Sequence, residues 1–384
     1  MATATISLPS QPTSFQGATA PCEPPPLPKW EKPPDTKEYA DWADILTVNL
    51  SLYSSHKEVL VETVRTALQR DGFFYVVGHG IPLEKIERQF DIAKQAFDAV
   101  SLEEKLKHLA PIVEKGCYGG YKLVKMWELN HGVKDSIEHY DFNFLRDSAS
   151  DAVARHPKAL RPYVPEARGF MDELRQSVLR RITSLIDAVL DLPEGTLWDL
   201  HEGKGLKSTR DLFRYQMYNP LSKEEAKMTN GVMLNGHTDI GAITLLVSQP
   251  VAGLQVLMPD DVWRYVKYKE GSIVVNIGDQ LSLKTGGILK GTMHRGEFIS
   301  PPSDQVHLRR LGVFYFVDFA GHTPLDLFPS ETVRERGRIM FQDHVPTAEE
   351  WRVIRTQSYG LAKFIKGEEY DVEIINGAEL RHYH

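Results

Sequence analysis

Asn235-Gly236-His237-Thr238-Asp239-Ile240-Gly241 is the stretch that decides the fold of this chain. A second histidine, His294, follows 55 positions after Asp239 (294 minus 239). Residues i and i+2 of a strand point to the same side, so His237 and Asp239 can both reach one ion. His294 would then come from a neighbouring strand that is distant in sequence. Two imidazoles and one carboxylate on one face of an octahedral metal are typical of oxygen-activating non-haem Fe(II) sites.

The tripeptide His237-Thr238-Asp239 is weak evidence when taken alone, because the chain holds 14 histidines and such spacings arise by chance. The alternatives are a structural histidine at 237 and a turn residue at 239. The matching His294 argues against both alternatives. The sequence around the three residues therefore has to decide.

Composition places the chain among ordinary soluble globular proteins. It has 384 residues, of which 42% are hydrophobic and 25% charged, enough for one large domain or two smaller ones. A net charge of -7 argues against a nucleic-acid or anionic-membrane partner, since both favour clustered Lys and Arg. Only two cysteines are present, so a disulfide framework is not expected. With no apolar run of spanning length and no signal peptide, we expect a cytoplasmic protein, and nothing demands more than a monomer.

The composition and the apolar pattern of the sequence change along the chain and predict four parts. Residues 1–36 are rich in Pro, Ser and Thr and read as a flexible tail. Residues 37–205 form a mixed α/β region with a long helix at 167–190, whose apolar stripe predicts packing against a sheet. Short apolar runs between turn residues in 206–325 favour a sandwich or barrel, of which the jelly roll is one form. Residues 326–384 read as a helical extension that begins with a capping box at 347–350 and ends in a solvated tail.

Several further motifs occur in order around the candidate metal ligands. They are Gly72-Phe73-Phe74, His79-Gly80-Ile81, Glu103-Glu104-Lys105, Gly253-Leu254-Gln255-Val256, Trp263, Asn276-Ile277-Gly278-Asp279, Lys290-Gly291-Thr292-Met293-His294-Arg295 and Arg310-Leu311-Gly312. The series resembles the isopenicillin N synthase-like branch of the Fe(II)/2-oxoglutarate-dependent dioxygenases, over roughly residues 45–345. The resemblance implies an α+β protein with a mainly β core, a double-stranded β-helix (jelly roll) flanked by helices.

The resemblance also implies the ligands and cosubstrates. His237, Asp239 and His294 would hold Fe(II), and 2-oxoglutarate and O2 would take the three remaining coordination positions. The family anchors the far carboxylate of 2-oxoglutarate with an Arg-x-Ser pair on a late strand. Aligning the aromatic run 314–316 selects Arg310 over Arg309 as this anchor. Gly312 then stands at the serine position, which removes one hydroxyl donor of roughly 1 kcal/mol while the charge-assisted pair remains.

An earlier strand offers further contacts to the cosubstrate and the substrate. Arg214, Gln216 and Tyr218 alternate and so share one face. Tyr218 resembles the family tyrosine that contacts the cosubstrate carboxylate, with Gln216 where many members have asparagine. The alternative is an ordinary strand whose tyrosine faces the core. Four residues are candidates for the substrate pocket: Arg214, Tyr140, Phe142 and Phe316. Plain core packing is the alternative for Tyr140 and Phe142, while Asn276 and Asp279 read as structural.

The leading interpretation is an iron- and 2-oxoglutarate-dependent oxygenase that hydroxylates a small organic molecule of specialised metabolism, with desaturation and cyclisation as the other outcomes. One alternative is an Fe(II) oxidase of the same fold that uses no 2-oxoglutarate, for which Gly312 leaves room. The other is a non-catalytic binder of small molecules. Succinate release and O2 consumption would separate the three.

Overall fold

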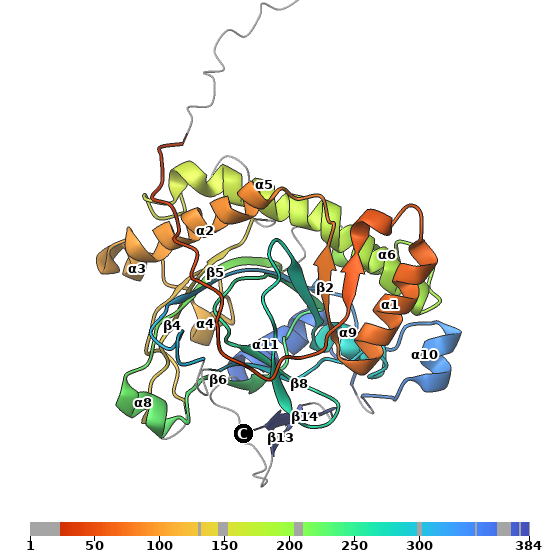
Figure 1. Ribbon diagram of the computed structural model, residues 1–384. Helices are drawn as coiled ribbons and strands as arrows, with labels where there is room; N and C mark the ends of the chain where they lie inside the picture. Colours follow the sequence, from red (N-terminus) through yellow and green to blue (C-terminus); the bar gives the residue numbers. More distant parts are fainter. Residues whose placement is uncertain are drawn as a thin grey trace, which may run out of the picture.

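The computed structural model describes residues 24–129, 132–144, 153–202, 210–297, 302–341, 344–358, 370–375 and 378–383. Two sheets form a jelly roll, as the sequence predicts (Figure 1). The eight-stranded sheet has the order β1 (Thr47–Asn49), β2 (Phe73–Val77), β10 (Ile273–Ile277), β7 (Ile243–Val247), β12 (Arg310–Val317), β5 (Leu212–Tyr218), β4 (Ile137–Phe142) and β3 (Gly120–Lys122). The four-stranded sheet has the order β6 (Val232–His237), β11 (His294–Glu297), β8 (Leu254–Leu257) and β9 (Trp263–Tyr265).

The strands of the N-terminal region complete the larger sheet on both sides. β2 pairs with β10, and β4 pairs with β5. The region that the sequence assigns to 37–205 thus shares one sheet with the jelly-roll core.

Strand β12 shows how alternation divides the two faces of the large sheet. Leu311, Val313, Tyr315 and Val317 belong to the main hydrophobic core beneath the helices. The alternate residues Arg310, Phe314 and Phe316 line an internal cavity between the sheets. This alternation positions the site.

Helices cover the outer face of the large sheet (Figure 1). The principal ones are α1 (Lys57–Arg70), α2 (Leu83–Asp98), α5 (Val164–Glu173) and α6 (Arg180–Val189). A π-helical segment, Leu174–Leu179, joins α5 to α6, so the long helix predicted at 167–190 is present with one irregular turn. Its apolar stripe is buried as predicted: Met171, Leu174, Val178, Ile182, Leu185 and Val189. The shorter helices are α3 (Leu102–Lys107), α4 (Ile112–Lys115), α7 (Thr196–Glu202), α8 (Lys223–Met228), α9 (Asp279–Lys284), α10 (Glu331–Arg336) and α11 (Ala348–Ser358).

The N-terminal stretch differs from the prediction where it is described. Residues 24–36 run over the body of the protein and are fixed to it. Trp30 stacks on Phe90 with ring centroids 4.3 Å apart, and its backbone N–H donates to Asp91. The Pro34 carbonyl accepts from Gln305. Because a stacked ring and backbone hydrogen bonds hold this stretch, the prediction of a flexible tail is wrong for residues 24–36, and residues 1–23 lie outside the described part.

The C-terminal region also departs from the prediction. Helix α11 begins at the predicted capping box, in which the Thr347 hydroxyl accepts from the Glu350 backbone N–H. Two strands follow, β13 (Tyr370–Ile375) and β14 (Ala378–Tyr383), paired as an antiparallel hairpin. The prediction of a helical extension over 326–384 is therefore wrong for residues 370–375 and 378–383, which form strands. The backbone hydrogen bonds between β13 and β14 form this hairpin although the sequence of both strands contains charged residues.

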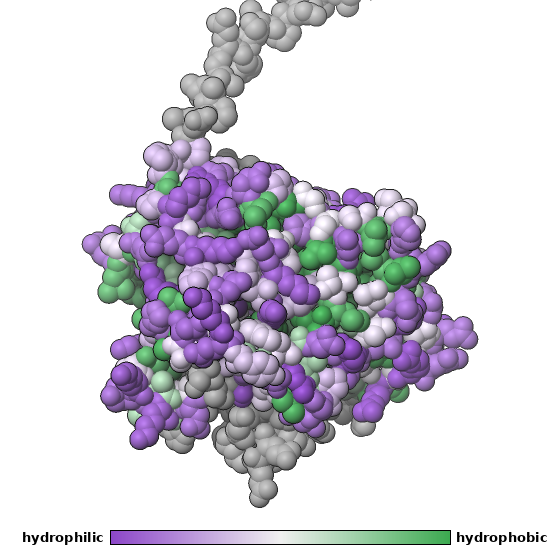
Figure 2. Space-filling view, in the orientation of Figure 1, coloured by the Kyte–Doolittle hydropathy of each residue, from purple (hydrophilic) through white to green (hydrophobic). Residues whose placement is uncertain are grey.

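The surface is polar on the face shown in Figure 2, where hydrophilic side chains enclose only small apolar groups. Within the described ranges, no helix combines the length and apolar character that a bilayer crossing requires.

Candidate metal and cosubstrate site

His237, Asp239 and His294 converge at one end of the cavity. One nitrogen or oxygen atom from each side chain lies within 4.8 Å of the others. The Asp239 Oδ1 atom lies 3.6 Å from His294 Nε2 and 4.0 Å from His237 Nε2. The two histidines come from β6 and β11, where they are register partners, and Asp239 follows two residues after the end of β6. The donor set and its one-sided arrangement fit a non-haem Fe(II) ion whose open side faces the cavity.

Neighbouring side chains orient the candidate ligands. The Thr244 hydroxyl and the Asn276 amide donate to Asp239 Oδ2 at 2.6 and 2.7 Å, which leaves Oδ1 to face the histidines. The His294 Nδ1 lies 3.1 Å from the Thr292 carbonyl, which favours a proton on Nδ1 and a free Nε2. Such partners fix ring orientation and raise ligand affinity in metal sites. Asn276 thus holds a ligand, a role more specific than the structural one expected from its turn.

The charges of the triad suit a cation. Burial opposes ionisation of Asp239, but the adjacent His294 and His237 and the Asn276 hydrogen bond hold its pKa well below the usual range. The carboxylate is therefore ionised at neutral pH. An anionic oxygen between two imidazoles provides the electrostatic requirement for a divalent ion.

The same cavity, with a volume of about 180 Å³, carries a buried cation that has no carboxylate partner within the part of the chain that the structure describes. Arg310 is 5% exposed, and its Nε atom has no hydrogen-bond partner among the described residues. Its guanidinium lies over the Tyr218 ring, 5.1 Å from the centroid, and the two residues are register partners on β12 and β5. Burial lowers the pKa of Arg310, while Tyr218 opposes that shift. A buried guanidinium facing a cavity requires an anion, and a carboxylate matches it in a bidentate manner.

Arg309, the neighbour of Arg310, points the other way. It lies on the surface and pairs with Asp98 at 2.8 Å. The structure therefore brings Arg310, Tyr218 and Gln216 to the cavity and leaves Arg309 outside it.

The space beside Gly312 is filled by a neighbouring aromatic ring. A Cβ atom at this position would collide with the edge of the Phe314 ring. Phe314 itself stacks on Phe316, with centroids 5.6 Å apart and planes 5° from parallel. The Phe314 ring thus fills the space that the side chain of the family serine would need.

Arg214 faces the cavity, as expected, but as one half of an ion pair. Its Nε and Nη2 atoms donate to Asp141 at 2.6 and 3.0 Å. The guanidinium lies between the rings of Tyr118 and Phe316, at 5.3 and 4.9 Å from their centroids. It forms a rigid wall of the cavity together with Phe316.

The predicted pocket roles of Tyr140 and Phe142 are wrong. Both side chains lie in the main core, where Phe142 stacks on Phe144 and the Tyr140 hydroxyl contacts His156. Tyr140 pairs in register with Tyr215, a core residue, whereas Asp141 pairs with Arg214. The two aromatic residues share one face as expected, but it is the face turned away from the cavity.

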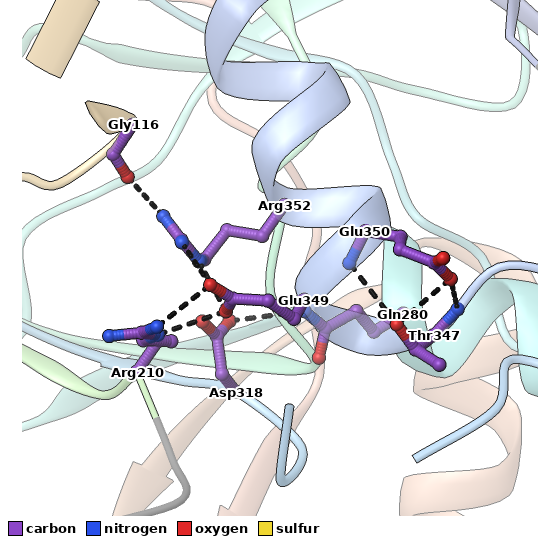
Figure 3. Close-up of polar contacts among 8 residues, drawn as sticks. All are labelled: Gly116, Arg210, Gln280, Asp318, Thr347, Glu349, Glu350 and Arg352. Atoms are coloured by element: carbon purple, nitrogen blue, oxygen red, sulfur yellow. Dashed lines mark hydrogen bonds and ion pairs between the residues drawn. The ribbon is translucent and has the colours of Figure 1, made fainter. Parts of the chain in front are cut away.

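The cavity lining also includes residues of a polar cluster that the sequence did not indicate (Figure 3). Arg210 and Arg352 each donate two hydrogen bonds to Glu349. Arg352 also donates to the Gly116 carbonyl. Asp318 lies beside them, where burial first and Asp211 second raise its pKa to about 7. The capping box predicted helix α11, but not that its arginines face the cavity.

Two family models match the chain. Residues 45–163 match the N-terminal region of a "non-haem dioxygenase in morphine synthesis", and residues 211–317 match the 2OG-Fe(II) oxygenase superfamily. The second match spans all three candidate metal ligands and Arg310.

Curated proteins and solved structures agree with these matches. The chain is 29% identical over 260 residues to a 2-oxoglutarate-Fe(II) type oxidoreductase of Emericella nidulans, covering 62% of this chain and 70% of the relative. It is 27% identical to leucoanthocyanidin dioxygenase 1 of Oryza sativa subsp. indica, covering 70% and 74% of the two chains. The structure of a full-length Neurospora crassa protein in complex with alpha-KG superposes with a TM-score of 0.66 at 21% identity, covering 84% of this chain and 99% of that chain, which supports the fold.

Proposed function

Because this chain belongs to the isopenicillin N synthase-like family of 2-oxoglutarate–Fe(II) oxygenases, we propose that it hydroxylates a small organic molecule of specialised metabolism. Desaturation and cyclisation are the other outcomes open to the same site. The protein is an oxidoreductase that uses Fe(II), 2-oxoglutarate and O2. The observation that supports the proposal best is that one cavity holds both the triad and Arg310, a guanidinium with no carboxylate partner in the described ranges.

In this proposal the residues of the site have the following roles. His237, Asp239 and His294 hold Fe(II), which when bound couples oxidative decarboxylation of 2-oxoglutarate to oxidation of the substrate. Arg310 and Tyr218 bind the far carboxylate of 2-oxoglutarate and set its orientation toward the metal. Gln216 lies beside them, 5% exposed. The ring pair Phe314–Phe316 and the Arg214–Asp141 pair exclude water and give the substrate chamber a flat wall.

A small substrate is favoured by the form of the cavity. It has a volume of about 180 Å³ and combines apolar walls with several charged side chains. Such a lining is typical of sites for small molecules. From composition and motif order we also propose a cytoplasmic monomer without a nucleic-acid or membrane partner, divided near residues 36, 205 and 325.

Counting succinate tests the proposed function. The protein, reconstituted with Fe(II) without oxygen, is exposed to O2 and 2-oxoglutarate with a panel of candidate metabolites. We expect succinate to form in step with oxidised product. Product without succinate would favour an oxidase that uses no 2-oxoglutarate, and no O2 consumption with any compound would favour a binder.

A further inference from the structure

The geometry points to a second recognition site in the wall of the cavity, formed by Asp318 and Arg210. We infer that it binds the outer end of an uncharged, planar substrate that presents a hydrogen-bond donor beside an acceptor, as a cyclic imide or lactam does. This inference rests on the proposed function, because it names the substrate class of the same chamber. It concerns residues other than the metal and cosubstrate ligands.

Asp318 lies far from the cosubstrate anchor. It follows β12 eight positions after Arg310, which corresponds to about 26 Å of extended strand. Both side chains nevertheless line the same cavity. A substrate held at Asp318 would therefore be anchored away from the residue that binds the far carboxylate of 2-oxoglutarate.

Asp318 is buried, at 8% exposure, yet it has few partners within the protein. Its Oδ1 atom accepts one long hydrogen bond from Gln280 Nε2, at 3.3 Å. Among the described residues no cation pairs with it, although two guanidiniums lie close enough to affect its charge. A buried carboxyl is stabilised when it is hydrogen-bonded, and the place of Asp318 in the lining lets it accept a donor from a molecule in the cavity.

The neighbouring arginines are fixed by a different carboxylate. Glu349 accepts from Arg210 at 2.8 and 2.9 Å and from Arg352 at 2.9 and 3.2 Å. Arg210 uses Nε and Nη2 for this contact, and no partner within the described chain engages its Nη1. Figure 3 shows Arg210 and Asp318 next to the shared Glu349. The cavity end therefore offers an acceptor, Asp318, close to a donor, Arg210.

Charge balance argues that the substrate is neutral at this end. Two guanidiniums lie next to two carboxyl groups, Glu349 and Asp318. Of the other arginines of the lining, Arg214 pairs with Asp141 and Arg355 with Asp279, while Arg310 is assigned to the carboxylate of 2-oxoglutarate. A carboxylate on the substrate would lie beside the carboxyl group of Asp318, and an ammonium would lie beside the guanidiniums of Arg210 and Arg352. Either charge would be desolvated beside a group of the same sign.

The walls next to this end favour a flat molecule. Phe314 and Phe316 present parallel rings on the cavity face of β12. Stacking on these rings would orient a planar heterocycle along the strand, with its polar edge toward Asp318.

Binding of phthalimide and N-methylphthalimide tests the inference. Calorimetry is done without oxygen on the full-length protein loaded with Fe(II) and 2-oxoglutarate. The first compound carries the N–H donor between carbonyl acceptors, and the second lacks only the donor. We expect phthalimide to bind at least about fivefold more tightly, the weight of one hydrogen bond of about 1 kcal/mol.

Asp318→Asn is the decisive variant. The Phe319 backbone N–H donates to Gln280 Oε1, so the Gln280 Nε2 group remains directed at position 318. The asparagine would keep its oxygen toward Gln280 and present its NH2 group to the cavity, which exchanges an acceptor for a donor. We expect this variant to lose the preference for phthalimide. Asp260→Asn, at a surface carboxylate paired with Arg264, is the matched control and should retain it.

Arg210→Lys provides an independent variant if the asparagine lowers stability. Lysine keeps a positive charge for Glu349 but lacks a second nitrogen that could donate to the ligand. We therefore expect Arg210→Lys to weaken phthalimide binding about threefold or more. Equal affinity of the wild type for both compounds, retained preference in Asp318→Asn, or tighter binding of benzoate than of phthalimide would each overturn the inference. The affinity for 2-oxoglutarate alone, measured on the Fe(II) protein, should stay within about twofold in all variants. A wild type that fails to bind 2-oxoglutarate would instead contradict the proposed function.

Discussion

His237 and His294 are direct register partners across the antiparallel strands β6 and β11, with ring centroids 4.6 Å apart. Strand β11 also pairs with β8 on its other edge, so a three-stranded arrangement fixes the position of His294. A slip of one residue would turn either imidazole to the opposite face of the sheet. The metal site therefore depends on backbone register as much as on the ligands themselves.

Asp239→Ala is expected to abolish turnover with the fold retained. The variant removes one of three ligands but no large core volume, so we expect activity to fall at least about 100-fold. The free energy of unfolding should change by less than about 3 kcal/mol. Succinate formation and urea unfolding measure the two effects. Activity near the wild-type level would contradict the assignment of the ligands.

Asn276→Ala is expected to weaken iron binding. The Asn276 amide and the Thr244 hydroxyl hold Asp239 Oδ2, and without one of them the carboxylate can rotate. Loss of such a partner lowers metal affinity by about 10- to 100-fold. Competition with a chelator measures the affinity, and Asn219→Ala, away from the triad, serves as the control. An unchanged affinity would show that Asp239 needs no such support.

Arg310→Ala is expected to raise the 2-oxoglutarate requirement far more than Arg309→Ala. Arg310 faces the cavity without a carboxylate partner among the described residues, whereas Arg309 pairs with Asp98 on the surface. Loss of a charge-assisted pair should raise the KM for 2-oxoglutarate by about tenfold or more. Steady-state kinetics on both variants decide this. Equal effects would mean that the anchor has been placed on the wrong residue.

Gly312→Ser is expected not to tighten 2-oxoglutarate binding, although it restores the hydroxyl typical of the family. Its Cβ would collide with the Phe314 ring, and displacing that ring should cost about 1–3 kcal/mol of stability. The double variant Gly312→Ser with Phe314→Leu should recover stability, because leucine vacates the contested space. Thermal unfolding and the KM for 2-oxoglutarate are the measurements. A single variant that is both stable and tighter for 2-oxoglutarate would contradict this role for Phe314.

Glu349 should make the docking of α11 sensitive to acid. Burial raises its pKa, but hydrogen bonds from Arg210 and Arg352 outweigh burial and lower the pKa from 4.5 to about 2. A depressed carboxyl pKa stabilises the fold above pH 4.5, and this contribution is lost as the pH falls from 4.5 toward 2. Allowing for partial exposure, we expect a loss of about 2 kcal/mol.

Comparing unfolding of the wild type and Glu349→Gln at pH 7 and pH 3 tests this contribution. The variant should be the less stable protein at pH 7, and the difference should shrink at pH 3. A constant difference between the two proteins would contradict the role of Glu349.

The sequence predicted the features that depend on local pattern. Alternation placed Arg214, Gln216 and Tyr218 on one face of β5, and all three line the cavity. The apolar stripe of the long helix is buried. The same alternation could not tell which face of β4 meets the cavity. Tyr140 and Phe142 were assigned by chemical type, whereas the register with β5 places Asp141 opposite Arg214.

Features that depend on distant contacts were missed. Arg210 and Asp318 flank the paired strands β5 and β12, and the docking of α11 adds Arg352, so the cluster depends on contacts between distant segments. The C-terminal hairpin did have a local signal, since Asn376-Gly377 lies between its two strands in sequence. That dipeptide is the strongest short-range indication of a two-residue hairpin turn.

Binding of 2-oxoglutarate to the Fe(II)-loaded protein without oxygen tests the central claim most directly. With calorimetry, the wild type should bind one equivalent of 2-oxoglutarate in the presence of Fe(II). His237→Ala and Arg310→Ala should each bind it at least about tenfold more weakly. Binding that is unaffected by the metal and by both variants would contradict a shared site of triad and guanidinium.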